Sequence, residues 1–305
     1  MEENAFILED RLQKIRQIIS KYGEDNFTLS FSGGKDSTVL SELLDMALPG
    51  NKIPRVYCDT GIELNMIQEF VSRMKEKDER VVIIKPHVPI KAMLDEEGYP
   101  FKSKHHSAMH ELYSRNPESK SALKYANREY NYHSDQCPKI LQYQFTQDYH
   151  GIKMSDKCCK RLKEEPLDEF GHQNNKQYSI VGIMPSEGGR RESAKCLSFS
   201  GKTLKYFHPL VPVSKAWEDW FIDQYNIEIC DIYKPPYNFH RTGCKGCPFN
   251  PHLQRELETL GKYLPNERKQ CEIIWKPVYD EYRRIGYRLK RDDGGDGDAD
   301  SFFGT

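Results

Sequence analysis

The sequence of 305 residues lacks three features that would assign it to a class at first sight. No apolar run approaches the ~20 residues that a membrane-spanning helix requires. The first residues, Met1-Glu2-Glu3-Asn4, include acids, whereas a secretory signal starts with a basic segment. The formal net charge is −1, so overall charge does not mark a nucleic-acid binder, and only a local basic patch could serve that purpose. These absences predict a cytoplasmic protein without a membrane anchor.

Cysteine is present nine times but is missing from the end of the chain. In a reducing compartment such cysteines serve as metal ligands, catalytic groups or buried thiols more readily than as disulfides. The last one is Cys271, and the residues after Arg291 contain none. Residues 292–305 repeat Asp and Gly without the Glu that closes a calcium loop, so we expect a disordered acidic tail there.

A short strand that turns through two glycines into a helix, residues 27–40, is the densest signal in the chain. Apolar residues alternate with polar ones before the turn and recur at helical spacing after it. The glycines let the backbone approach a ligand closely, and the unpaired N–H groups of a first helical turn attract an anion. An ordinary turn with a surface Lys-Asp pair is the alternative. The pattern predicts a phosphate site made of Ser32, Gly33, Gly34, Lys35, Asp36 and Ser37.

Strands alternate with helices through much of the chain. Residues 8–22 keep helical spacing, and strands are predicted at 55–59, 81–84 and 179–183, with a helix at 63–75. Such alternation predicts an α/β fold, a parallel twisted sheet with helices on both faces.

Polar residues follow the second predicted strand. Ligands of open parallel sheets bind beyond the carboxyl ends of the strands, where Asp59, Thr60 and Gly61 fall together with the glycine loop. Asp59 would hydrogen-bond a nucleotide or help to place a metal. Its alternative role is to cap the following helix.

A segment of helical texture, around residues 98–150, interrupts the alternation. Its tyrosines, histidines and basic residues suit a base-stacking surface, a solvated insertion or a lid over the nucleotide. His106 and His110 would share a helix face, but no nearby carboxylate or cysteine completes a metal set, so we expect a satisfied or solvated cluster.

The expected domains follow from these patterns. A nucleotide-binding α/β domain would cover residues 1–212 and include the insertion. A helical cysteine-bearing region would cover 213–291, followed by the acidic tail. Within that region, residues 214–225 are predicted to form an aromatic-rich helix that packs in a core.

Four cysteines occur in two clusters, Cys158-Cys159 and Cys244-x-x-Cys247, separated by 84 residues. Four thiolates can close one metal centre, and both zinc and iron–sulfur clusters accept such a set. Successive residues point apart in a regular backbone, so the adjacent pair favours a bulkier [4Fe–4S] centre over Zn²⁺. Buried free thiols are the remaining alternative.

Ser32-Gly33-Gly34-Lys35-Asp36-Ser37 resembles the PP-loop of the N-type ATP pyrophosphatases. Together with Asp59-Thr60-Gly61, residues 157–163 and residues 243–248, it resembles the phosphoadenylylsulfate (PAPS) reductase family, over roughly residues 25–250. The narrower resemblance is to the iron–sulfur branch, which includes adenylylsulfate reductases and the ATP-pyrophosphatase subunit of bacterial DNA phosphorothioation. It implies a Rossmann-like PP-loop fold and a cluster held by the four cysteines.

Two departures from the family pattern bear on the substrate. The family has a G-x-R-x-x-E-S-x-x-R segment at the anionic end of its substrate, and residues 182–191 fit in frame with Met184 in place of the first Arg and Gly188 in place of the Ser. Glu187 and Arg191 are retained, and Arg190 or Lys195 would supply the missing charge. The reductases also use a cysteine on a C-terminal segment, which is absent after Arg291.

The resemblance implies that the loop holds ATP, with Lys35, Asp36 and Ser37 as catalytic residues and Mg²⁺ bridging phosphate oxygens. Cleavage between the α- and β-phosphates would adenylate an oxygen, and sulfur from a donor protein such as a cysteine desulfurase would then replace it on a nucleic acid. The alternatives are thiol-dependent reduction of adenylylsulfate or PAPS to sulfite, and a nucleotide-binding partner subunit with a structural metal site. Sulfur donor, acceptor and oligomeric state stay open.

Overall fold

The structure is a computed structural model that describes residues 2–131, 136–187, 193–241 and 243–291. The chain folds into two units, and each unit combines two separate stretches of sequence. The first consists of Met1–His87 and Lys163–Thr242, the second of Val88–Leu162 and Gly243–Thr305. Of the residues in the expected acidic tail, 292–305, none is among those described.

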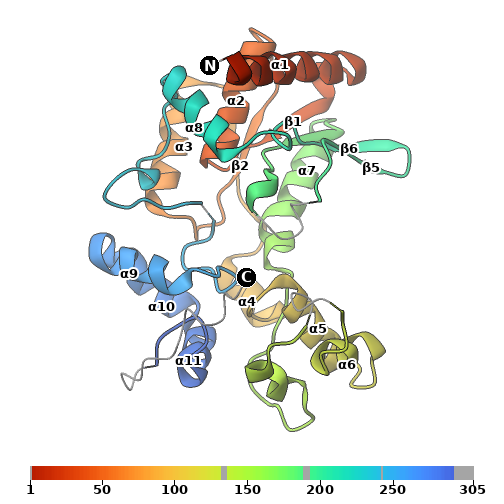
Figure 1. The fold of residues 1–305 in the computed structure, drawn as a ribbon, viewed down its shortest axis with the longest axis vertical. Helices are drawn as coiled ribbons and strands as arrows, with labels where there is room; N and C mark the ends of the chain where they lie inside the picture. Colours follow the sequence, from red (N-terminus) through yellow and green to blue (C-terminus); the bar gives the residue numbers. More distant parts are fainter. Residues whose placement is uncertain (1, 132–135, 188–192, 242, 292–305) are drawn as a thin grey trace. The chain divides into compact units, whose positions relative to one another are not determined.

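A six-stranded sheet is the centre of the first unit (Figure 1). Its strand order is β3-β2-β1-β4-β6-β5, and all neighbouring pairs are parallel except β5 with β6. The bounds are β1 (Phe27–Ser30), β2 (Arg55–Cys58), β3 (Val81–Ile84), β4 (Tyr178–Val181), β5 (Leu197–Ser200) and β6 (Thr203–Phe207). The predicted fold class is confirmed as a mostly parallel sheet with helices, and the sequence did not predict the β5–β6 hairpin.

Three helices share one apolar core with the sheet. They are α1 (Glu2–Tyr22), α2 (Lys35–Ala47) and α8 (Lys215–Gln224). Their buried side chains, such as Ile15, Leu43 and Phe221, lie in one cluster with β1 and β6 residues. Helices α3 (Asn65–Lys77) and α7 (Glu165–Gln173) pack beside β3 and β2 respectively.

The position of α8 differs from the expected domain boundary near residue 212. Trp217 and Phe221 are buried in the same core as α2, so packing assigns α8 to the sheet-containing unit. The boundary instead falls after Thr242, just before the Cys-x-x-Cys segment. The aromatic residues of 214–225 thus pack in a core as predicted, but in that of the sheet-containing unit.

The second unit is built from helices. Its first stretch contains α4 (Ile90–Glu97), α5 (Lys104–Arg115), α6 (Lys120–Ala126) and the 3-10 helix η3 (Lys139–Phe145). Its second stretch contains α9 (Leu253–Tyr263), α10 (Pro265–Ile274) and α11 (Lys276–Ile285). Within the described residues, no helix of either unit is both long and apolar enough to cross a membrane.

His106 and His110 lie inside the second unit, where they are structural. The His106 ring contacts the Tyr125 hydroxyl at 2.9 Å through Nδ1 and Gln144 Oε1 at 2.8 Å through Nε2. Burial lowers the pKa of both histidines, so the two rings are neutral at physiological pH. His106 and His110 therefore belong to a satisfied cluster, as the sequence predicted, and are not metal ligands.

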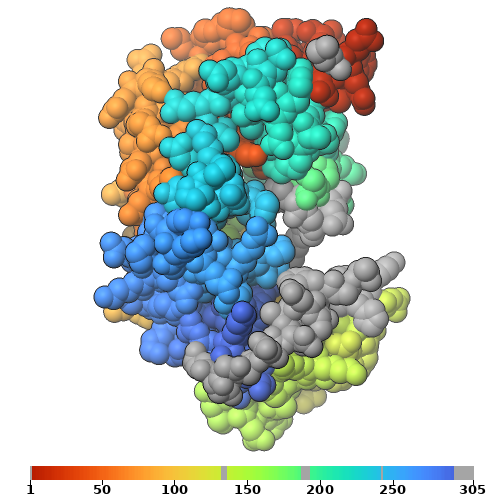
Figure 2. Space-filling view, turned by 60° about the vertical axis from the view of Figure 1, so that its left-hand side comes forward, coloured from red at the N-terminus to blue at the C-terminus, as the bar shows by residue number. Residues whose placement is uncertain are grey.

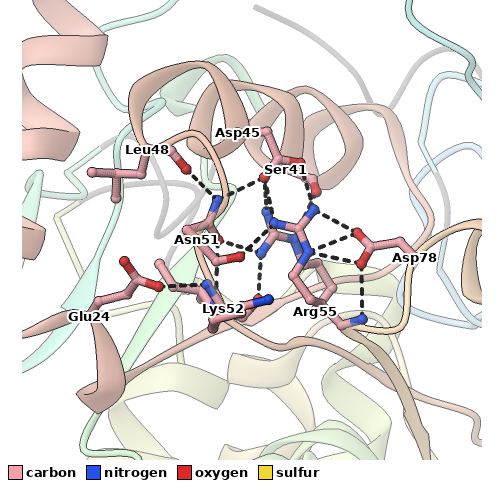
Figure 3. A network of polar contacts seen from close by, with 10 residues as sticks. Glu24, Ser41, Asp45, Leu48, Asn51, Lys52, Arg55 and Asp78 are labelled. Carbon is pink, nitrogen blue, oxygen red and sulfur yellow. Dashed lines mark hydrogen bonds and ion pairs between the residues drawn. The ribbon is translucent and has the colours of Figure 1, made fainter.

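A buried arginine network fixes the end of α2 that is opposite its glycine loop (Figure 3). Arg55, at the start of β2, donates to Asp45 Oδ1 and Asn51 Oδ1, both at 2.8 Å. Arg80 donates hydrogen bonds to both carboxylate oxygens of Asp45, at 2.7 and 2.9 Å, and also forms an ion pair with Asp78. Such bidentate charge-assisted bonds are geometrically specific, so α2 is held firmly against β2 and the loop before β3.

Candidate functional site

The predicted phosphate loop connects β1 to α2, and its shape depends on glycine. Gly33 has φ +69, and a Cβ added to it would lie 2.8 Å from Val71 Cγ2 and 3.2 Å from Ile67 Cγ2. Only glycine fits this position, because α3 packs directly on the loop. Gly34 has extended backbone and precedes α2, and because it has no side chain it cannot cap the first N–H groups of that helix.

Two serines hold the loop closed. The Ser37 hydroxyl donates to Gly34 O at 3.0 Å, accepts from Ser32 N at 3.2 Å and lies 3.1 Å from Ser32 Oγ. Ser32 Oγ in turn accepts from Gly34 N at 3.3 Å. Ser37 is buried, so its first role is to brace the turn that points the α2 N-terminus outward.

Helix α8 brings charged residues to this loop that the sequence did not identify. Lys35 Nζ pairs with Asp219 Oδ1 at 2.8 Å. Lys215 Nζ lies 2.8 Å from Asp36 Oδ1 and 2.8 Å from Glu218 Oε2. Residues 215, 218 and 219 share one face of α8 by helical spacing, whereas Trp217 and Phe221 face the core. The only available sequence signal was this polar face beside the aromatic one.

Tyr233, in the 3-10 helix η7 (Asp231–Tyr233), closes the same side of the loop. Its hydroxyl accepts from Lys35 N at 3.3 Å, and the Lys35 ammonium lies 5.8 Å from the centre of its ring. Figure 2 shows the cyan segment around η7 beside the orange residues of α3. Lys35 is therefore surrounded by an acid and an aromatic ring from segments far away in the sequence.

Glu218 is a fully buried acid next to the loop. Burial raises its pKa most, Asp36 raises it further and Lys215 opposes both, with a result of about 8. At neutral pH the carboxyl therefore keeps its proton. Its Oε1 atom is buried and has no hydrogen-bond partner among the described residues.

The residues after β2 brace the start of α3. Asp59 Oδ1 accepts from Gly61 N and from Gln68 Nε2, both at 3.0 Å. Thr60 N donates to Glu63 Oε2 at 3.0 Å. Asp59 does not cap the following helix, the alternative role, because the N-cap of α3 is Leu64 and makes no side-chain hydrogen bond. Since β1 and β2 are parallel neighbours, Asp59 and the glycine loop follow the same edge of the sheet, and a nucleotide role for Asp59 stays a prediction.

The segment that follows β4 approaches the loop through Gly182. A Cβ on Gly182 would lie 3.2 Å from the carbonyl carbon and oxygen of Asp36. Met184, which replaces an arginine of the family pattern, is buried in the core. Glu187 ends the 3-10 helix η5 (Pro185–Glu187), while Arg190 and Arg191 lie outside the described residues.

The Cys-x-x-Cys segment forms a tight turn in the second unit. Cys247 N donates to Cys244 O at 3.2 Å. Gly246 has φ +60, and a Cβ there would overlap Tyr279 Oη and lie 2.8 Å from Cys271 Sγ. The turn therefore requires glycine both for its backbone conformation and for the close approach of α10 and α11.

Aromatic side chains cap the carbonyl groups of this turn. Three carbonyl acceptors of this turn each receive a side-chain donor. The pairs are Trp275 Nε1 to Lys245 O at 2.9 Å, Tyr279 Oη to Gly246 O, and Tyr282 Oη to Pro248 O at 3.0 Å. All three aromatic side chains are almost fully buried, so their hydrogen bonds fix the turn to the helical core of the second unit.

Cys158 and Cys159 also belong to the second unit, and their thiols are hydrogen-bonded to each other. The chain leaves the pair through a π-helical turn, η4 (Lys160–Glu164). Such turns distort a helix locally and are frequent at functional sites. The distortion that convergence of adjacent cysteines requires is therefore present in the chain.

The four cysteines interact with one another electrostatically. The hydrogen bond with Cys159 and burial raise the pKa of Cys158, and the charges of Cys247 and Cys244 raise it further. Burial, with Cys244 and Cys159, does the same for Cys247. The structure thus gathers in one unit all four residues predicted as ligands. Among the described side chains, however, no three of His, Cys, Asp or Glu are spaced to hold a single metal ion.

Residues 26–126, which include β1, the glycine loop, α2 and β2, match the phosphoadenosine phosphosulfate reductase domain. The match covers 101 of the 305 residues, so it shows a region of the chain that is similar to the PAPS reductase domain. The predicted resemblance is therefore confirmed, and the loop before α2 is the PP-loop of this chain, part of a nucleotide-binding fold.

Curated relatives of this chain align over a short stretch. The GMP synthase of Thermosipho africanus is 35% identical over 88 residues, 28% of this chain and 16% of that protein. The GMP synthase of Xanthomonas axonopodis is 32% identical over 89 residues, 29% of this chain and 15% of that protein. The chain thus spans about a sixth of the length of these relatives.

Two solved structures are similar to this chain at low identity. A PAPS reductase from Candida auris in a phosphate complex has a TM-score of 0.40 and 12% identity, over 71% of this chain and 82% of that chain. A U34-tRNA thiolase from Methanococcus maripaludis with its [4Fe–4S] cluster has a TM-score of 0.39 and 14% identity, over 95% of this chain and 83% of that chain.

The four cysteines predicted as ligands belong to one unit, and Cys158 interacts electrostatically with Cys159, Cys244 and Cys247. A rigid turn carries Cys244 and Cys247, and a distorted helical turn follows Cys158 and Cys159. A shared metal centre at these four residues stays a prediction.

Proposed function

We propose that this chain binds ATP at its PP-loop and cleaves it between the α- and β-phosphates. The AMP moiety would pass to an oxygen of a nucleic acid, pyrophosphate would leave, and a sulfur nucleophile would then displace the AMP. The observation that supports this best is the loop itself. Its glycines shape the start of a helix whose N-cap residue, Gly34, provides no side-chain hydrogen bond, and the Lys35 ammonium lies on its first turn.

Each loop residue has a role in this reaction. The N–H groups at the start of α2 would bind the leaving pyrophosphate, and Lys35 would neutralise its charge. Ser32 and Ser37 keep the loop in the required shape through their mutual hydrogen bonds. Asp36 is the loop carboxylate that would hold Mg²⁺, which would supply Lewis-acid stabilisation of the phosphate charge.

The four cysteines would hold a [4Fe–4S] cluster in the second unit. When bound, the cluster would supply redox chemistry for sulfur transfer. The chain's own contribution is to keep the Cys244 to Cys247 turn rigid and the Cys158-Cys159 pair convergent. Sulfur itself would come from a donor protein such as a cysteine desulfurase.

Sulfite-forming reduction of adenylylsulfate or PAPS is the second candidate, because the matching domain is that of PAPS reductase. One observation disfavours it. Cys271, the last cysteine, is completely buried, and burial raises the pKa of its thiol to about 12. A protonated thiol beneath a rigid turn is a poor nucleophile for a bound sulfonucleotide.

The decisive experiment offers the anaerobic protein ATP, adenylylsulfate and PAPS separately and measures binding and products. Release of pyrophosphate from ATP, stimulated by a nucleic acid, is the expected result. Sulfite release from a sulfonucleotide would replace the proposal with the reductase. Tight ATP binding without either product would instead indicate a nucleotide-binding partner subunit.

A further inference from the structure

We infer that α8 forms a second wall of the nucleotide site, in which Lys215 binds the same phosphate groups as Lys35 and Asp219 competes with them for Lys35. The inference rests on the proposed binding of ATP at the PP-loop. It adds a phosphate ligand and a competing carboxylate that lie far outside the glycine loop in the sequence.

The contacts place both ammonium groups at the loop. Lys35 Nζ is 2.8 Å from Asp219 Oδ1, and Lys215 Nζ is 2.8 Å from Asp36 Oδ1. Asp36 directly follows Lys35 at the start of α2. Two ion pairs therefore join the first turn of α2 to α8, one with its lysine on α2 and one with its lysine on α8, at the helix end where an anion binds.

Glu218 shows that Lys215 is more than a surface lysine. Its buried Oε2 atom holds the Lys215 ammonium at 2.8 Å, while the Oε1 atom is buried without a hydrogen-bond partner among the described residues. An incompletely satisfied buried acid destabilises a fold, and a packed apolar residue would serve stability better. Its retention beside the loop is explained if it orients Lys215 toward a ligand.

The charges around the loop balance without a ligand. Lys35 and Lys215 supply two positive charges, Asp36 and Asp219 supply two negative ones, and Glu218 is neutral at pH 7 because burial raises its pKa to about 8. A phosphate chain can bind the ammonium groups of Lys35 and Lys215 only by displacing the carboxylates of Asp219 and Asp36. Removing Asp219 should therefore strengthen binding of a free polyanion, whereas removing Lys215 should weaken it.

Lys215 also accounts for a charge that the family pattern lacks here. Met184 occupies the position of an arginine and is buried in the core, where it cannot contact an anion. Lys195, one expected replacement, is exposed after β4, and Arg190 lies outside the described residues. Lys215 is a basic side chain that contacts the PP-loop in addition to Lys35 itself.

The test measures binding of inorganic pyrophosphate, without divalent cations, by isothermal titration calorimetry. We expect Lys215→Met to weaken binding about tenfold or more, as loss of one charge-assisted contact does, with partial rescue in Lys215→Arg. Asp219→Asn should tighten binding several-fold. Lys77→Met, which removes an exposed lysine paired with Glu228 in the same unit, is the matched control and should change nothing.

Opposite signs for the two α8 variants distinguish this role from a structural one, which would weaken binding in both. Unchanged affinity in Lys215→Met, or weaker binding in Asp219→Asn, overturns the inference. Lys35→Met separates it from the proposed function. If Lys35→Met abolishes binding while Lys215→Met does not alter it, only the second wall is wrong. If the unmodified protein does not bind pyrophosphate, or if Lys35→Met binds it as tightly as the unmodified protein does, the ATP proposal itself fails.

Discussion

Replacing Gly246 by alanine should loosen the cysteine turn more than any other single methyl group added to the second unit. The new Cβ would overlap Tyr279 Oη and lie 2.8 Å from Cys271 Sγ and 2.9 Å from Cys271 Cβ. Both neighbours are completely buried, so neither can move into solvent. The substitution therefore displaces either the turn or the donor that caps its carbonyl.

The loss in free energy of unfolding that we expect for Gly246→Ala has two parts, which can be added. A left-handed conformation costs a residue with a Cβ about 1–2 kcal/mol relative to glycine. Overpacking a buried methyl group costs a further ~1–3 kcal/mol. We therefore expect Gly246→Ala to lower the free energy of unfolding by roughly 2–5 kcal/mol. We also expect loss of bound iron, because the thiols of Cys244 and Cys247 shift.

Two other glycines separate these parts. Gly50 has φ +77 with nothing within 4 Å of an added Cβ, so Gly50→Ala reports the backbone cost alone. Gly243 also has open space around it, and its φ does not lie in the left-handed region, so Gly243→Ala should change stability by no more than ~0.5 kcal/mol. Urea unfolding followed by circular dichroism, together with iron analysis of anaerobic protein, gives both readouts.

The reasoning is refuted if Gly246→Ala costs no more than Gly50→Ala, since the packing part would then be absent. It is equally refuted if the iron content of Gly246→Ala equals that of the unmodified protein while stability falls. In that case the turn would not be a ligand-bearing element, and the four-cysteine centre would lose its structural support.

Three further predictions concern the two candidate sites. Lys35→Ala and Ser37→Ala should lower ATP turnover about a hundredfold or more, as loss of one preorganised donor does, while circular dichroism stays unchanged; normal turnover in both would remove the PP-loop assignment. Cys158→Ser and Cys247→Ser should abolish the brown colour and the expected ~4 irons per chain of anaerobic protein and destabilise the second unit, whereas stoichiometric zinc without colour would exclude the cluster. Glu218, whose pKa is raised to about 8, binds a proton in the fold that it releases on unfolding, so stability should fall as pH rises from the ordinary value of 4.5 through about 8. Glu218→Gln should flatten that fall in urea titrations, and an unchanged pH profile would contradict the assignment.

The sequence predicted the elements whose signals are local. Gly33 and Gly34 sit between a period of two and a helical period, which identifies a strand, a turn and a helix without any distant contact. The β5–β6 hairpin escaped prediction although Thr203–Phe207 alternates in burial. Its short strands are half exposed and carry no continuous apolar run, so periodicity alone does not separate them from a loop.

The grouping of the chain into two units could not be predicted from composition. The Cys158-Cys159 pair lies in the middle of the chain, and the turn from Cys244 to Cys247 lies near its end, yet both belong to the second unit. Only the cysteine spacing indicated that they meet. Packing of α8 on α2 decides the other boundary, and an aromatic helix pattern shows that a helix is buried without showing in which core.

Hydrophobic periodicity also did not identify the polar residues of α8, because it shows which face of a helix is buried and not what lies opposite the polar face. The aromatic side chains of residues 217–225 dominate the pattern, while Lys215 and Asp219 appear as the ordinary polar face of an amphipathic helix. Their role depends on what lies opposite them, and the glycine loop is nearly 180 residues earlier in the chain, since Lys215 and Asp36 differ by 179 positions. Local sequence therefore predicts the loop but not its second wall.

The aromatic residues of α11 show how one pattern can carry two kinds of information. Tyr279, Tyr282 and the N-cap residue Trp275 recur at helical spacing, and all three side chains are buried. Phenylalanine or leucine would satisfy that face equally well. Tryptophan and tyrosine add a polar tip, and each tip here ends on a carbonyl of the Lys245 to Pro248 turn. Regular structure does not satisfy these acceptors, so the residue type, rather than the spacing, shows that this core caps the turn on which the proposed ligands Cys244 and Cys247 lie.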